Sequence, residues 1–253
     1  MPERSAALFK TFAALHVPGD PVVLYNIWDA GSAQAVARAG AKAIATGSHP
    51  VASANGFPDG ETVPIDFALA NASRIIGAVE LPVTVDFEGG YAVDPGALEH
   101  NFALLTATGA IGCNFEDQVI GGEGLHPLPL QAKRIAAARR GAGDNFFINA
   151  RTDLFLKNKP ETHDVAMVDE AIERVLAFAD AGGSGFFVPR LGDLKLVENL
   201  CRASPIPVNA IAYPGAPTKA QWATAGIARI SHGPFPLNAL MKTFEEMARA
   251  ALN

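Results

Sequence analysis

The sequence predicts an α/β protein, specifically a single (β/α)8 barrel of the TIM type over residues 1–253. Short apolar runs that end in polar or glycine-rich turns recur about eight times, as expected for parallel strands. Segments with apolar residues spaced by about 3.6 positions separate these runs and indicate helices. Eight such units in 253 residues fit a closed barrel better than an open sheet, although periodicity alone leaves the open sheet possible.

The elements are expected in the following order. Residues 1–19 have apolar positions at helical spacing, interrupted by Glu3, Arg4 and Lys10, which indicates a leading helix rather than a signal peptide. The expected strands are 22–27, 42–47, 83–88, 112–117, 146–151, 185–189, 207–212 and 229–232. The expected helices are 32–39, 66–79, 95–108, 130–140, 164–181, 194–203, 218–225 and 237–252.

Residues typical of helix ends support these boundaries. Pro95 follows Asp94, and Thr218 precedes a helical segment, as is common at helix starts. Four glycines are expected just past helix ends, where a left-handed cap is common: Gly40, Gly109, Gly141 and Gly182. No linker or repeat divides the chain, so one domain is expected.

Composition excludes some classes of function. Twenty Lys and Arg residues against 26 Asp and Glu give a net charge of −6, which disfavours nucleic acid as a partner. Cys113 and Cys201 have no metal-type spacing and form no disulfide framework, so a cytoplasmic location is the simplest. No uninterrupted apolar run reaches about 18 residues, and no membrane span is expected.

Two expected strands end in pairs of carboxylates, Asp86 with Glu88 and Glu116 with Asp117. The carboxyl ends of barrel strands face the ligand site, so these carboxylates can converge on one cation. Oxygen ligands favour Mg²⁺ or Mn²⁺ over zinc. We expect Asp86 to bind the metal directly and Glu88 and Glu116 to reach it directly or through water. Alternatively, some of these carboxylates cap helices or pair with lysines.

Arg151 ends the fifth expected strand and is suited to bind a substrate carboxylate through two parallel hydrogen bonds. The alternative is an ion pair with Asp153 or Glu116. The glycine-rich segment 120–127 predicts a mobile loop that closes over the site, on which Glu123 and His126 are candidate proton-transfer groups. An exposed, solvated His126 is the alternative.

The other histidines are weaker candidates. His16, His100 and His163 are interpreted as surface residues, whereas His49 and His232 lie at expected strand ends.

Five motifs, in this order and at these spacings, resemble the isocitrate lyase and phosphoenolpyruvate mutase superfamily over nearly the whole chain. They are NIWDAGS at 26–32, GFPDGE at 56–61, DFEGGY at 86–91, EDQ at 116–118 and NAR at 149–151. The resemblance implies a magnesium-dependent barrel, usually a tetramer in which neighbouring subunits exchange the last helix. It also implies cleavage or formation of carbon–carbon or carbon–phosphorus bonds beside a carbonyl, through an enolate of pyruvate or a related acid.

The resemblance also implies roles for individual residues. By position, the acidic residues of the metal shell are Asp59, Asp86, Glu88 and Glu116. Arg151 matches the arginine that binds the substrate carboxylate. The residues that match other substrate-binding positions are Thr46, Gly47, Ser48 and Asn209.

The chain departs from the superfamily pattern in the loop and in the metal motif. Gly124 stands where the lyases have a proton-donating cysteine, and Gly122 where the phosphonomutases have a lysine, whereas His126 is retained. Glu88 replaces a more usual aspartate, which lengthens this ligand's reach by one methylene.

A reaction that needs neither loop residue remains compatible with the sequence. We expect a magnesium-dependent lyase that cleaves or decarboxylates a small α-keto or 2-hydroxy diacid through a metal-stabilised enolate. The alternatives are a carbon–phosphorus bond enzyme acting on phosphonopyruvate or phosphoenolpyruvate, and a non-catalytic barrel that binds a keto acid. A homo-oligomer, tetramer or dimer, is expected.

Overall fold

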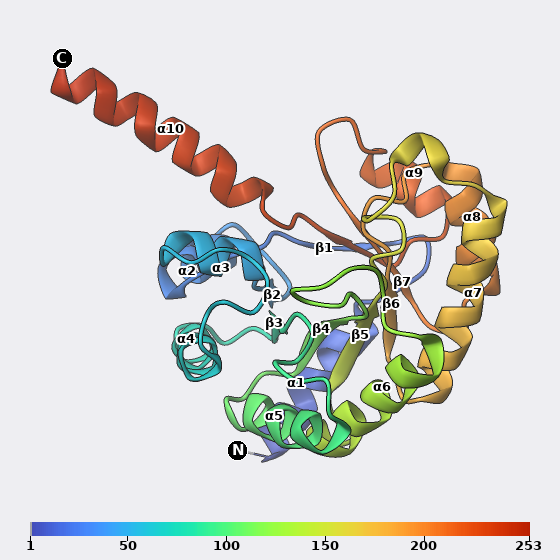
Figure 1. The fold of residues 1–253 in the computed structure, drawn as a ribbon. Coiled ribbons are helices and arrows are strands. Elements are labelled where there is room, and N and C mark those ends of the chain that lie inside the picture. Colours follow the sequence, from blue (N-terminus) through green and yellow to red (C-terminus); the bar gives the residue numbers. More distant parts are fainter. Residues whose placement is uncertain (1) are drawn as a thin grey trace.

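A computed structural model describes residues 2–253 (Figure 1). Eight parallel strands form one sheet in the order β1-β8-β7-β6-β5-β4-β3-β2. They are β1 Val22–Leu24, β2 Ile44–Ala45, β3 Val83–Asp86, β4 Gly112–Glu116, β5 Phe147–Arg151, β6 Gly185–Phe187, β7 Val208–Ile211 and β8 Arg229–Ser231. A parallel bridge between Ile27 and Thr46 joins the two edges, so the predicted TIM-type barrel is confirmed in a nearly closed form.

Every expected helix is present, with ends that shift by a few residues. The helices are α1 Pro2–Ala14, α2 Ala30–Arg38, α3 Ser48–Ala54, α4 Ile65–Gly77, α5 Pro95–Ala107, α6 Leu128–Ala142, α7 Val165–Asp180, α8 Leu194–Ala203, α9 Lys219–Thr224 and α10 Phe235–Leu252, with a 3₁₀ turn η1 at Pro160–Thr162. Helix α3 and turn η1 were not predicted. Both are short and lack a capping side chain, whereas Thr218 marks the start of the equally short α9.

Helix α6 corrects the expected position of Gly141. This glycine lies inside α6, and Gly143, with φ +73°, takes the position after the helix end. A Cβ atom at Gly141 would lie 2.0 Å from the carbonyl oxygen of Glu99 on α5. Gly141 therefore serves the close approach of α5 and α6 rather than a helix cap.

Helix α1 packs its apolar face across the amino-terminal end of the barrel. Phe12 is fully buried and shares a cluster with Leu24 and Phe147. His16, expected at the surface, is instead 7% exposed and stacks on the Phe147 ring with 4.3 Å between ring centroids. That expectation was wrong because helical periodicity does not reveal that the barrel covers this end of α1.

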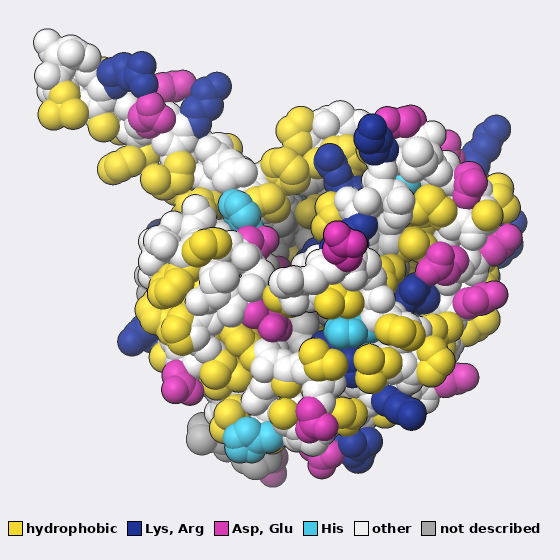
Figure 2. Space-filling model, in the orientation of Figure 1, with side chains coloured by type: hydrophobic (Ala, Val, Ile, Leu, Met, Phe, Trp, Pro, Cys, Tyr) yellow, Lys and Arg dark blue, Asp and Glu magenta, His cyan; other side chains and the backbone are white. Residues whose placement is uncertain are grey.

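Helix α10 projects away from the barrel (Figure 1, red). Figure 2 shows apolar side chains along it, and Leu240, Met241, Phe244 and Met247 are each more than half exposed. No helix of residues 2–253 has the length and hydropathy required to traverse a bilayer. The apolar face of α10 is considered further below.

Candidate active site

A cavity of about 410 Å³ lies at the carboxyl ends of the strands. The end of each strand, or the segment directly after it, contributes to its wall. In strand order, these residues include Asn26, Ser48, Asp86, Asn114, Arg151, Phe187, Ile211 and Ser231. The cavity is thus at the position where TIM barrels bind their ligands.

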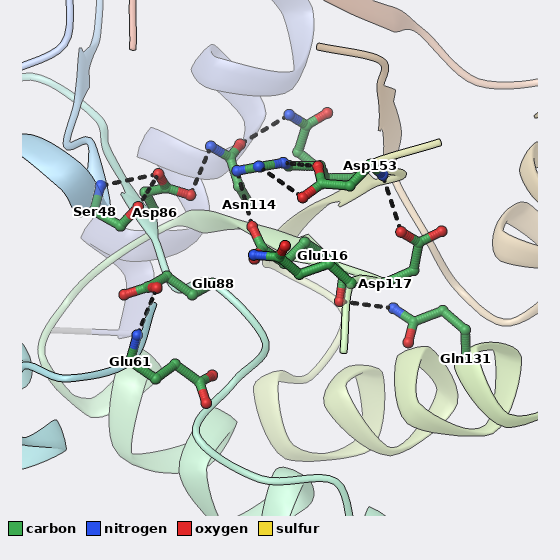
Figure 3. A network of polar contacts seen from close by, with 12 residues as sticks. Ser48, Glu61, Asp86, Glu88, Asn114, Glu116, Asp117, Gln131 and Asp153 are labelled. Atoms are coloured by element: carbon green, nitrogen blue, oxygen red, sulfur yellow. Dashed lines mark hydrogen bonds and ion pairs between the residues drawn. The ribbon is translucent and has the colours of Figure 1, made fainter. Parts of the chain in front are cut away.

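Asp86, the last residue of β3, is held by hydrogen bonds on both carboxylate oxygens (Figure 3). Its Oδ2 accepts hydrogen bonds from the Ser48 backbone N–H (2.9 Å) and the Ser48 hydroxyl (3.0 Å). Its Oδ1 accepts one from Asn114 Nδ2 (3.1 Å). A carboxylate has about four acceptor positions, so about one position is left for a further ligand.

A buried arginine fixes Asn114. Arg229 Nη2 and Asn149 Nδ2 both donate to Asn114 Oδ1, at 3.1 and 2.9 Å, and the Asn114 amide nitrogen therefore faces Asp86. Arg229 is 1% exposed, and burial lowers its pKa to about 9, although Asp86 opposes this shift. The sequence prediction assigned no role to Arg229, although an arginine between Ala228 and Ile230 in the last expected strand is a signal for a buried functional residue.

Glu88 lies beside Asp86 in a smaller adjoining cavity rather than in the main one. The Glu61 backbone N–H donates to Glu88 Oε2 (2.7 Å), and Glu61 Oε1 accepts from the Tyr91 backbone N–H (2.6 Å). Burial, and then the charge of Asp86, raise the pKa of Glu88 to about 8. The same two causes raise the pKa of Asp59, which lines the main cavity. Three carboxyl groups are therefore concentrated on this side, and their simultaneous ionisation is unfavourable.

Backbone strain is concentrated around the site. The non-glycine residues with positive φ are Glu61 (55°), Glu88 (49°), Tyr91 (58°) and Arg190 (75°). Glu61 donates its backbone N–H to the Glu88 carboxylate, and Tyr91 lines the same small cavity as Glu88. Arg190 lines the main cavity. Such conformations are retained where the surrounding structure enforces them, commonly at functional sites.

Arg151 forms the ion pairs that were one of its two predicted roles, and it also lies where the other role, binding of a substrate carboxylate, would require it. Its guanidinium lines the cavity and also pairs with Glu116 (Nη1 to Oε2, 2.8 Å) and with Asp153 (Nε to Oδ1, 2.5 Å). Burial alone would lower the pKa of Arg151, but Glu116, Asp153 and Asp86 together raise it. Burial raises the pKa of Glu116, against the effect of Arg151. The ion pairs fix the guanidinium at the wall of the cavity.

The predicted substrate-binding residues divide into two groups. Gly47 and Ser48 line the cavity. Thr46 instead accepts a hydrogen bond at its hydroxyl from the Asp86 backbone N–H (2.8 Å). Asn209 is 1% exposed and donates to the Ser231 hydroxyl (3.2 Å), so it contacts a cavity residue rather than lining the cavity itself.

The predicted proton-transfer residues do not line the cavity. Residues 118–125 form a compact excursion closed by an antiparallel bridge between Gln118 and Leu125. Glu123 is exposed in its turn. His126 is 6% exposed, which corrects the expectation of a solvated loop histidine, and its backbone N–H donates to the Asp117 carbonyl oxygen (2.7 Å). Burial and Arg134 lower the pKa of His126.

The donor set fits a hard divalent cation with few protein ligands. Within residues 2–253, no three His, Cys, Asp or Glu side chains are grouped closely enough to enclose a metal. Mg²⁺ typically keeps several waters and takes one or two carboxylates plus substrate oxygens. The acceptor position left on Asp86, with Asp59 on the same cavity, matches this pattern.

A family model, described as phosphoenolpyruvate phosphomutase, matches residues 12–252. The chain belongs to this family. It is 36% identical over 243 residues to an uncharacterized protein of Mycobacterium tuberculosis (strain H37Rv), covering 95% of this chain and 88% of that one. It is 28% identical to the 2-methylisocitrate lyase of Escherichia coli (strain K12), over 79% of this chain and 68% of that one.

A solved structure from the same family has nearly the same fold. It is that of a proposed phosphonomutase from Burkholderia cenocepacia J2315, with a TM-score of 0.95 and 44% identity, covering 98% of this chain and 99% of that chain. The phosphoenolpyruvate phosphomutase family falls within the isocitrate lyase and phosphoenolpyruvate mutase superfamily, so the resemblance inferred from the five motifs is confirmed. The matching family model is named for a phosphomutase, and the Escherichia coli relative is a lyase.

Proposed function

We propose that the protein is a magnesium-dependent carbon–carbon lyase that cleaves or decarboxylates a small α-keto or 2-hydroxy diacid. The observation that carries this proposal is the geometry of Asp86. Ser48 and Asn114 fix its carboxylate on the wall of the cavity at the strand ends. The similarity to 2-methylisocitrate lyase supports cleavage of a carbon–carbon bond.

The acidic residues would hold the metal in two ways. Asp86 is the direct ligand, and Asp59, Glu88 and Glu116 act through water or by their charge. When bound, Mg²⁺ or Mn²⁺ stabilises the negative charge that develops on the keto-acid oxygens. The raised pKa values of Asp59 and Glu88 fit this assignment, because burial and the charge of Asp86 make their ionised forms unfavourable until a cation neutralises them.

The remaining residues would bind and orient the substrate. Arg151 binds one carboxylate of the acid, and its pairing with Glu116 and Asp153 holds its guanidinium in one orientation. Gly47 and Ser48 contact the other end. Thr46 positions Asp86, and Asn209 positions Ser231.

Proton transfer is proposed for Glu123 and His126 after movement of the 118–125 excursion. Neither side chain lines the cavity in this structure, so the excursion has to fold over it before either group reaches the substrate. Solvent water is the alternative proton source.

A carbon–phosphorus bond enzyme is the second candidate. The similarity to the proposed phosphonomutase favours it. Incubation with Mg²⁺ and, separately, oxaloacetate, 2-methylisocitrate, 2,3-dimethylmalate and phosphonopyruvate distinguishes the two. Pyruvate without phosphate supports the lyase, and phosphate release supports the second candidate.

The Asp86→Ala variant is the control for this panel, because product that persists in it does not come from the proposed site. Turnover of none of the four compounds, with metal bound, would contradict the lyase proposal and favour the keto-acid-binding barrel.

We also infer that α10 packs on a second copy of the chain. A cavity of about 620 Å³, larger than that at the strand ends, lies against β1, α2 and residues 39–42, and Val23 and Tyr25 on its wall are 37% and 47% exposed. It contains no converging carboxylates, so we do not assign chemistry to it. Its largely apolar wall complements the apolar face of α10, which supports a homo-oligomer, tetramer or dimer, with exchanged helices.

A further inference from the structure

Arg190 is a cavity residue to which the superfamily resemblance gave no role. It follows β6, lines the cavity and has a backbone φ of +75°. Its guanidinium lies over the Tyr213 ring, 4.8 Å from the centroid. Arg190 thus has a left-handed backbone conformation, which is unfavourable for a residue other than glycine. The surrounding structure therefore holds Arg190 in this position.

The charge of Arg190 is not satisfied within the protein. Among the ion pairs formed by residues 2–253, none includes Arg190. Arg151, the other arginine on the cavity wall, pairs with both Glu116 and Asp153. Arg190 is therefore the cavity guanidinium whose charge is available to an anionic ligand.

The two arginines and the two carboxylates belong to different parts of the wall. Asp86 ends β3, and Asp59 precedes α4, whereas Arg151 ends β5 and Arg190 follows β6. β3 and β6 are separated in the sheet by β4 and β5. A ligand whose oxygens lie near Asp86 therefore has its far end available to Arg190. An Arg side chain binds a carboxylate or a phosphonate group through paired N–H donors.

We propose that Arg190 determines substrate specificity by binding the second anionic group of a dianionic acid. The inference rests on the proposed function and deepens it, because it names the residue that binds the second acid group of the proposed diacid. Tyr213 positions the guanidinium by stacking, without contact with the substrate. The second anionic group is a carboxylate or a phosphonate, since both share the required charge and geometry.

Binding of matched ligands tests this proposal without requiring turnover. Malate and 2-hydroxybutanoate have the same four-carbon skeleton and differ in a terminal carboxylate against a methyl group. Their dissociation constants are measured by calorimetry with Mg²⁺ for the wild type, Arg190→Gln and Arg190→Lys, and proton NMR of the samples verifies that the ligands are intact. 3-Phosphonolactate provides the phosphonate arm.

We expect Arg190→Gln to weaken malate binding roughly 10- to 100-fold, the usual range for a lost charge-assisted hydrogen bond, and to leave 2-hydroxybutanoate binding nearly unchanged. Arg190→Lys should recover part of the loss because it retains the charge. If Arg190→Gln weakens the binding of 3-phosphonolactate but not that of malate, the proposal is also supported, and the second anionic group of the substrate is a phosphonate. Arg202→Gln is the control, since Arg202 is exposed on α8 and pairs with Glu198.

Three results would overturn the proposal. In the first, Arg190→Gln weakens the binding of malate and 2-hydroxybutanoate equally. In the second, it weakens the binding of neither malate nor 3-phosphonolactate. In the third, the wild type binds neither dianion more tightly than 2-hydroxybutanoate. These outcomes are separate from failure of the proposed function. Selective loss of dianion binding in a protein that turns over no substrate would retain the role of Arg190 in a binding barrel.

Discussion

Asp86 is oriented by a chain of hydrogen bonds that runs from the cavity wall into the interior of the barrel. Ser48 and Asn114 hold its two oxygens, and Arg229 holds Asn114 from the interior of the barrel. Arg229 and Asn114 are 115 positions apart in the chain, so their contact exists only because β8 and β4 face the same interior. A single carboxylate can be recognised at a strand end from the sequence, whereas its supporting hydrogen bonds cannot.

The burial of His16 makes the free energy of unfolding depend on pH. Burial, and then Arg229, lower its pKa from 6.5 to about 3. The unfolded chain therefore binds a proton that the folded chain excludes between these pH values, so stability is lost as pH falls below about 6.5. His16→Phe should remove this dependence. Between pH 7.5 and 5.5, denaturant unfolding should show the wild type losing about 1.4 kcal/mol more than the variant. Parallel losses in both proteins would refute the assignment.

Arg151 links stability to function at one residue. Arg151→Met would leave Glu116 and Asp153 buried without their cationic partner, which should lower the free energy of unfolding by about 3 to 5 kcal/mol and abolish substrate turnover. Arg202→Met, which breaks an exposed pair, should cost less than about 1 kcal/mol. Urea unfolding of both variants is the measurement. Equally small losses of unfolding free energy in the two variants would show that the Arg151 ion pairs are not a buried network that stabilises the fold.

At the scale of elements, continuous apolar runs predicted all eight strands, because barrel strands are buried on both faces, and helical apolar spacing predicted most helices, because each buries one face. The same patterns could not predict α3, whose seven residues are fixed by the Ser48 contact with Asp86 rather than by their own period. They also could not separate a capping glycine from one at a helix contact, as Gly141 demonstrates.

Gly141 makes the contact of α5 with α6 testable. Gly141→Ala should destabilise the protein by roughly 1 to 3 kcal/mol or more, because the new Cβ atom would clash with the Glu99 backbone. Gly77→Ala is the matched control, since a Cβ atom there meets no atom within 4 Å, and alanine should stabilise α4 by up to about 1 kcal/mol. Thermal unfolding compares the two. A neutral Gly141→Ala would mean that the helices separate at little cost.

For the whole molecule, the barrel brings the ends of β3, β4 and β5 together, so the sequence could place Asp86, Glu116 and Arg151 near one another. It left open whether Arg151 pairs with Glu116, and it could not predict that His126 would be buried away from the cavity. Those outcomes depend on packing of the loops, which has no period in the sequence. The departure of α10 from the barrel likewise becomes visible only in three dimensions (Figure 1).

The exposed face of α10 predicts an oligomer. Replacement of Phe244 and Met247 by Glu should dissociate it, because two charges would be placed on a face that is otherwise apolar. Light scattering after size-exclusion chromatography measures the mass, and Lys242→Ala on the same helix is the control. A wild-type protein that is monomeric at micromolar concentration would contradict the exchanged-helix assembly.

The metal site at Asp86 is the central claim, and calorimetric titration with Mg²⁺ in the presence of oxalate tests it most directly. We expect the wild type to bind Mg²⁺ and Asp86→Asn to bind it at least roughly 10- to 100-fold more weakly, as is typical when a metal site loses a supporting group. Asp169→Asn, on the exposed side of α7, should bind as the wild type does. Equal affinity of the wild type and Asp86→Asn would place the metal elsewhere and contradict the account.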